Sequence, residues 1–221
     1  MLRFVDASPP LLGIDGPTMN DEPMYPLFLN LRERNCVVVG GNAIAEAKVR
    51  DLLQAGAKVK VIASELTDAI ATWARTERVQ WENRDYESGD LRDAFVVVTA
   101  AGNKVNAAVY AEAEARNTLC NAVDDVEHCN CFASSVVRRG PLQIAISTAG
   151  NSPALAQRLR LELGHKFGPE YVTWVKELGR LRRSLFSETE FDPEARRERL
   201  HEQASAAAFE LFRHSQNREI S

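Results

Sequence analysis

The chain has 221 residues, of which 45% are hydrophobic, and its formal net charge at pH 7 is −4. This length allows one compact domain with a smaller appendage, and the hydrophobic share is sufficient for a sizeable core. A net negative charge gives no general attraction to nucleic acids or anionic membranes, so neither is expected as a partner. No apolar run approaches the ~20 residues of a spanning helix, and the N-terminus lacks a secretory signal, so a cytoplasmic location is expected.

The first 23 residues contain several prolines and no periodic pattern, so we predict a flexible N-terminal extension over 1–23. A strand, a glycine turn, a helix and a second strand are then predicted between residues 36 and 63. The apolar run 36–39 ends at Gly40-Gly41, and a helical apolar stripe follows that Gly56 closes. This is the order of a βαβ unit.

The turn of this unit is similar to the dinucleotide fingerprint G-x-G-x-x-G/A. It reads Gly40-Gly41-Asn42-Ala43-Ile44 followed by Ala45. The first glycine permits a tight turn, and the helix N-terminus offers free N–H groups to a pyrophosphate. Asn42 replaces the second glycine. We expect the turn to survive, because asparagine tolerates a positive φ better than most residues.

Further strands and helices alternate along the chain. The sequence predicts a helix from Ser64-Glu65 to about residue 76, strands at 79–82, 95–99 and 119–123, and a helix over 104–116. This alternation predicts an α/β fold with a Rossmann-type doubly wound parallel sheet.

Four loops of this sheet are expected to share one edge. Gly40, Ser64, Ala100 and Asp124 each follow the carboxyl end of a predicted strand. Ligands of open parallel sheets bind in the crevice at that edge. A carboxylate there could act as a general base, so Asp124 is the catalytic candidate; the alternative is that Asp124, or the next residue Asp125, only caps a turn.

The choice between NAD and NADP rests on Glu65. The acid that binds the ribose hydroxyls usually follows the glycine turn by ~20 residues, and Glu65 lies near that spacing with no arginine beside it. This favours NAD over NADP. No Y-x-x-x-K pair, nucleophile elbow or P-loop accompanies the turn.

The four cysteines indicate reduced thiols in a cytoplasmic protein, because two of them fall in predicted buried strands. Residues 128–131 read HCNC, which contains a single C-x-C pair. Structural zinc sites usually combine two cysteine pairs, so we expect an ordinary loop and no metal site.

The pattern changes after residue 133. Two strands are predicted around a turn at 138–141, and helices at 153–167, 170–186 and 193–213, the last burying Leu200 and Leu211. Arg138 and Arg139 on the turn could bind an anion or could be a solvated tip.

Taken together, these stretches resemble the precorrin-2 dehydrogenase family, which includes the N-terminal part of siroheme synthase. The matching stretches are 25–31, 37–41 with 45–48, 120–124, and 138–148 running into 152–156. The last of these is the most specific, because a generic Rossmann protein does not need it. Departures from the family pattern lie at Asn42, at Ala101 and at 133–135.

The resemblance implies NAD-dependent oxidation of precorrin-2 to sirohydrochlorin by a homodimer, and in some members also iron insertion. It implies a Rossmann domain over 24–137, a dimerisation region over 138–168 and a helical C-terminal domain over 169–221. It also implies that Asp124 assists proton removal. The cofactor contacts implied by the resemblance are Ala43, Ile44, Ser64 and Glu65, to which the glycine turn and the sheet edge add Gly40, Gly41, Asn42 and Ala100. The implied substrate contacts are Ser147 and Thr148, and Arg138, Arg139 and Arg158 are candidate partners of the substrate carboxylates by their charge alone.

Two alternatives remain open at this stage. The chain could be a dinucleotide-sensing Rossmann module without catalysis, which would bind NAD without a change in absorbance. It could also be a chelatase that retains the fold but no longer uses NAD, which would insert metal in the absence of NAD.

Overall fold

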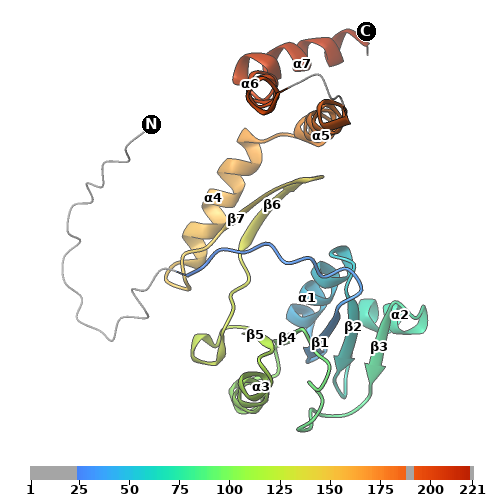
Figure 1. The fold of residues 1–221 in the computed structure, drawn as a ribbon. Helices are drawn as coiled ribbons and strands as arrows, with labels where there is room; N and C mark the ends of the chain where they lie inside the picture. The colour runs from blue at the N-terminus through green and yellow to red at the C-terminus, as the bar shows by residue number, and fades with distance from the viewer. Residues whose placement is uncertain (1–23, 188–191, 220–221) are drawn as a thin grey trace, which may run out of the picture.

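The centre of the fold is a five-stranded parallel sheet. The computed structural model describes residues 24–187 and 192–219. The strand order is β3-β2-β1-β4-β5, and every neighbouring pair is parallel (Figure 1). The strands are β1 (Asn35–Val39), β2 (Lys58–Ile62), β3 (Val79–Glu82), β4 (Val96–Thr99) and β5 (Leu119–Ala122). The predicted doubly wound sheet is confirmed, and its order reverses between β1 and β4.

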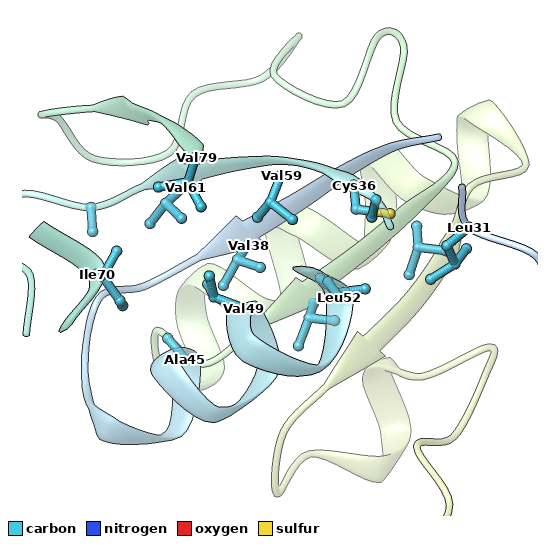
Figure 2. Packing of buried hydrophobic residues seen from close by; sticks show 14 residues of the cluster. Leu31, Cys36, Val38, Ala45, Val49, Leu52, Val59, Val61, Ile70 and Val79 are labelled. Atoms are coloured by element: carbon cyan, nitrogen blue, oxygen red, sulfur yellow. The ribbon is translucent and has the colours of Figure 1, made fainter. Parts of the chain in front are cut away.

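Helices cover both faces of this sheet. They are α1 (Ala43–Gln54), α2 (Asp68–Arg75) and α3 (Asn103–Arg116). Because side chains alternate along a strand, Cys36 and Val38 of β1 pack in one cluster with α1 and α2, whereas Val37 and Val39 pack in a second cluster with α3. Figure 2 shows the first cluster, in which Val49 of α1 lies beside Val38.

Helix α2 begins later than the sequence indicates. The predicted start was Ser64-Glu65, but residues 64–67 form a loop, and the Thr67 hydroxyl accepts a hydrogen bond from the N–H of Ile70 at 3.4 Å. Threonine is a good N-cap residue, and it starts the helix at Asp68. The loop before it remains free to lie against the glycine turn.

A hairpin and a long helix follow the sheet. Strands β6 (Ser135–Arg139) and β7 (Leu142–Ile146) are antiparallel, and α4 (Pro153–Lys166) packs against both. The expected boundary between 137 and 138 falls within β6, so the hairpin as a whole belongs to the second region.

Three helices complete the described chain: α5 (Tyr171–Ser187), α6 (Pro193–Gln203) and α7 (Ala206–Glu219). The single helix predicted over 193–213 was wrong. It is broken at 204–205, and the Ser205 hydroxyl caps α7 by accepting from the N–H of Ala208 at 3.2 Å. The break shifts the helical phase, so Phe209 is buried against Tyr171, whereas Leu211 is 73% exposed.

No helix in the described part of the chain has the length and apolarity needed to cross a membrane. In Figure 1 the hairpin and α4 lie between the sheet and helices α5–α7.

The hairpin turn is made by Gly140, whose φ of 57° is unfavourable for residues with a side chain.

A buried carboxylate fastens the connection between β3 and β4 to α3. Glu112 accepts hydrogen bonds from the Tyr86 hydroxyl (2.5 Å), the N–H of Gly89 (2.8 Å), the N–H of Leu91 (3.2 Å) and the Nε of Arg116 (2.6 Å). Burial acts to raise the pKa of Glu112, but these donors outweigh it, and the pKa lies below its usual range.

We expect Glu112→Ala to lower the free energy of unfolding by about 3 kcal/mol at pH 7, because it leaves four donors, among them the buried N–H of Leu91, without their acceptor. Since the folded pKa is depressed, this contribution is present above the unfolded pKa of about 4.3 and is lost as the pH falls through the folded pKa. Urea unfolding at pH 7 measures it. The exposed Glu198→Ala serves as control, and an equal loss in both variants would contradict the expectation.

Candidate dinucleotide site

The loops after β1, β2, β4 and β5 meet at one edge of the sheet, as predicted. The N–H of Gly40 donates to the carbonyl of Ile62, that of Ala100 to the carbonyl of Val39, and that of Val123 to the carbonyl of Thr99. These bonds continue the parallel ladders past the strand ends. The glycine turn and Ala100 follow β1 and β4, between which the strand order reverses, and this is where open α/β sheets bind ligands.

The two glycines of the turn are required by close packing. Gly40 has a φ of 114°, and a Cβ there would lie 3.1 Å from the carbonyl oxygen of Ala100. At Gly41 a Cβ would lie 1.9 Å from the carbonyl oxygen of Glu65, so no side chain fits. The carbonyl of Gly41 also accepts from the N–H of Thr67 at 3.0 Å. The turn is therefore held between the loops after β2 and β4.

Asn42 plays a different part from the one expected. The turn survives, as expected, but the reason given for it was wrong: the φ of Asn42 is −78°, so its tolerance of a positive φ is not used. Its side chain is the N-cap of α1: Oδ1 accepts from the N–H groups of Ile44 and Ala45, both at 3.0 Å. Its Nδ2 donates to the carbonyl of Ala100 at 3.1 Å. Ala45, the last residue of the fingerprint, is fully buried in the cluster between α1 and the sheet.

The remaining cofactor candidates surround this turn. Ala43 is the first residue of α1, and Ile44 is 44% exposed. Ser64 and Glu65 are both exposed, and the Glu65 backbone lies directly against Gly41. A glycine turn at the start of a helix and a nearby exposed carboxylate fit a dinucleotide, whose pyrophosphate would take the turn and whose ribose would take the carboxylate.

Asp124 lies at the same edge in an unusual backbone conformation. Its φ is 58°, which is the left-handed region, and its side chain is exposed. Asparagine and aspartate tolerate this region better than most residues. The conformation turns the chain sharply out of β5, so that the carboxylate follows the strand end without continuing the strand.

A buried hydrogen-bonded chain fixes the residue that follows Asp124. The hydroxyl of Thr99 donates to Oδ1 of Asn106 at 2.7 Å, and Nδ2 of Asn106 donates to Asp125 at 3.2 Å. The other carboxylate oxygen of Asp125 lies 2.8 Å from Nδ1 of His128. Thr99 and Asn106 are almost completely buried. The chain thus joins the end of β4, helix α3 and the short helix η1 (Val126–His128) to the Asp124 loop.

Sequence reasoning missed Asn106. The signal was a polar residue on the buried stripe of a helix, three positions before Val109 and seven before Ala113. Such a residue needs a buried partner, and the sequence does not identify a partner on another element.

The HCNC stretch closes the exposed edge of β5. The Cys129 thiol contacts the N–H and the carbonyl of Ala122, both at 3.2 Å, and Oδ1 of Asn130 accepts from the N–H of Cys120 at 2.6 Å. Burial raises the pKa of Cys120 to about 12 and that of Cys131 to about 11. Within the described residues no three metal-binding side chains come together. The stretch therefore holds its loop against the edge of β5 through hydrogen bonds to the strand backbone.

The substrate candidates lie on β6, on α4 and in the loop between β7 and α4. In the described chain none of the strands β1–β5 and none of the helices α1–α3 packs extensively against β6, β7 or α4. Ser147 and Thr148 bind within their own loop, where their hydroxyl oxygens accept from the N–H groups of Ala149 and Ser152. Their hydroxyl oxygens are therefore engaged within the loop between β7 and α4.

The three arginines differ in availability. Arg139 donates to the carbonyls of Phe167 (2.8 Å), Gly164 (2.7 Å) and Arg138 (2.9 Å), so its guanidinium already caps the end of α4. Arg138 is exposed, and Arg158 is exposed beside Glu162 at 3.4 Å. Of the three, only the guanidinium of Arg139 is fully engaged by backbone carbonyls.

Two family models match the chain in sequence. Residues 27–135 match a family described as "Putative NAD(P)-binding", and residues 139–165 match one described as "Sirohaem biosynthesis protein central". The fold and the glycine turn thus define a Rossmann-type protein that binds a nicotinamide dinucleotide.

Individual relatives point the same way. The chain is 39% identical over 136 residues to a siroheme synthase of Baumannia cicadellinicola, covering 61% of this chain and 29% of the relative. It is 33% identical over 174 residues to a siroheme synthase of Neisseria meningitidis, covering 78% of this chain and 36% of the relative. A solved structure described as "SirC, precorrin-2 dehydrogenase" aligns with a TM-score of 0.70 and 25% identity, covering 88% of this chain and all of that one.

The resemblance stated from the sequence is confirmed: the chain is a relative of precorrin-2 dehydrogenase and of siroheme synthase. It spans about a third of the length of the siroheme synthases that it matches.

We expect Asn106→Ala to lower the free energy of unfolding by about 2 kcal/mol, because it leaves the Thr99 hydroxyl and one Asp125 oxygen without their buried partner. Thermal or urea unfolding measures the loss. Asn103→Ala, at an exposed position in the same helix, is the matched control. A loss below ~0.5 kcal/mol for Asn106→Ala would show that the chain of hydrogen bonds does not hold the loop.

Proposed function

We propose that the chain is an NAD-dependent dehydrogenase that oxidises precorrin-2 to sirohydrochlorin in siroheme biosynthesis. The observation that carries this proposal is the position of Asp124 at the sheet edge that also holds the glycine turn. The sirohaem family segment and the structural likeness to a precorrin-2 dehydrogenase support the choice of substrate.

In this reaction the macrocycle loses two hydrogen atoms. One leaves as a hydride, with two electrons, and the other leaves as a proton. The bound NAD supplies the hydride acceptor. Asp124 accepts the proton from the macrocycle carbon framework as a general base. Its exposed carboxylate and sharp backbone turn place it where a large ligand can approach.

The choice of NAD over NADP is supported by Glu65. Glu65 follows β2, and its backbone lies against Gly41. Its exposed carboxylate is therefore at the position where the adenosine ribose would bind. A carboxylate can accept hydrogen bonds from ribose hydroxyls and repels a 2′-phosphate. A cytoplasmic location belongs to the same proposal and is supported by four free cysteines.

The second part of the proposal is a homodimer whose dimerisation region lies around 138–168. In the described chain β6, β7 and α4 do not pack extensively against the sheet, and a second copy would complete the cleft between them. The extended segment before β1 exposes large apolar side chains, with Tyr25 83% and Phe28 66% exposed. Such surface is usually covered by a partner.

We expect Asp124→Asn to reduce turnover of precorrin-2 by roughly 10²- to 10⁴-fold, the usual contribution of a general base. Asparagine retains the left-handed backbone at φ 58°, so the fold and NAD binding should be unchanged. The assay follows NADH and the sirohydrochlorin spectrum without metal. Asp93→Ala, an exposed change in the loop before β4, is the control and should turn over normally.

Wild-type protein that binds NAD but forms no NADH would favour the dinucleotide-sensing module. Metal insertion into sirohydrochlorin in the absence of NAD, together with no NADH formation, would favour the chelatase. Either result would overturn the proposed dehydrogenase.

We expect the protein to sediment as a dimer and Leu161→Glu to shift it toward the monomer, because Leu161 is a 49% exposed apolar side chain on α4. Analytical ultracentrifugation gives the mass. Leu211→Glu, on the 73% exposed face of α7, is the control and should remain dimeric. A monomeric wild type would contradict the proposed assembly.

A further inference from the structure

The side chain of Asn42 uses the N–H groups that a cofactor would need. Its Oδ1 accepts from Ile44 and Ala45 at 3.0 Å each, in the first turn of α1. In a dinucleotide-binding βαβ unit these first-turn N–H groups face the pyrophosphate. A carboxamide oxygen and a phosphate oxygen are both hydrogen-bond acceptors, so they compete for the same donors.

The other end of the carboxamide holds a neighbouring strand end. Nδ2 of Asn42 donates to the carbonyl of Ala100 at 3.1 Å, so one side chain joins the start of α1 to the end of β4. Displacing the carboxamide from α1 therefore also releases a contact across the point where the strand order reverses.

We propose that Asn42 is an affinity-determining residue that lowers the affinity for the dinucleotide, because its carboxamide must leave the first turn of α1 before the pyrophosphate can bind there. This inference rests on the proposed use of a nicotinamide dinucleotide. It extends that proposal by naming a residue that competes with the cofactor within the site.

The backbone at Asn42 allows a clean test. With φ −78° and ψ −179° the residue is in ordinary extended backbone, so alanine fits without strain. Alanine removes the competing acceptor and leaves the backbone N–H groups unchanged. Glycine is a second variant, because it is well tolerated at the N-cap and keeps the helix formed.

The measurement is calorimetric titration of the purified chain with NAD, and separately with NADP. We expect Asn42→Ala to bind NAD about fivefold more tightly, within roughly 2- to 30-fold, from the usual contribution of an N-cap. Asn42→Gly should change affinity in the same direction. Asn42→Asp should bind roughly tenfold more weakly or worse, because a carboxylate caps the same N–H groups and repels the pyrophosphate.

A matched N-cap lies far along the chain. Asp192 accepts from the N–H groups of Glu194 (2.8 Å) and Ala195 (2.9 Å) at the start of α6, the same pattern that Asn42 makes at α1. Asp192→Ala removes a cap without touching the sheet edge, so its NAD affinity should equal that of the wild type. Thermal unfolding of each variant reports the loss of the cap.

Equal NAD affinity in the wild type, Asn42→Ala, Asn42→Gly and Asn42→Asp would overturn this inference and leave the proposed function standing. Weaker binding by both Asn42→Ala and Asn42→Gly would also overturn it, since the carboxamide would then assist the cofactor. Failure of every variant to bind either dinucleotide would overturn both the inference and the proposed function.

Discussion

The close approach of the glycine turn to its two neighbouring loops is the constraint on which the site depends. The backbone of Gly41 lies against the carbonyl of Glu65, and that of Gly40 lies against the carbonyl of Ala100. A side chain at either position would push the loops after β1, β2 and β4 apart. These loops carry the cofactor candidates, so the absence of two Cβ atoms gathers them into one crevice.

A second constraint holds the other wall of that crevice. The carboxylate of Asp125 is tied to α3 through Asn106, and Asn106 is tied to β4 through Thr99. Asp124 can therefore adopt a left-handed backbone at a strand end without support from its own side chain. The cost of a left-handed residue is of the order of 1 kcal/mol, which is comparable to the net contribution of one such hydrogen bond. The catalytic candidate thus remains exposed while its neighbours are fixed.

The chain divides its chemistry between two regions. The dinucleotide and base candidates lie at the sheet edge, whereas Ser147, Thr148 and Arg158 lie on the hairpin and α4. Arg139, which resembles a substrate ligand in sequence, has its guanidinium on three backbone carbonyls. The hairpin and α4 do not pack extensively against the sheet in the described chain, so the proposed homodimer concerns both assembly and the substrate cleft.

The sequence by itself determined the alternation of strands and helices, the glycine turn and the position of Asp124, because apolar periodicity, glycine and strand ends are local properties. It did not identify the partners of Asn42 and Asn106, since each is recognised by a residue far away in the chain. It misplaced the start of α2 and missed the break at 204–205, because caps from Thr67 and Ser205 decide helix boundaries more finely than periodicity does. Only the tertiary structure showed that the Asn42 side chain joins the first turn of α1 to the end of β4, because the carbonyl of Ala100 lies 58 residues away in the chain.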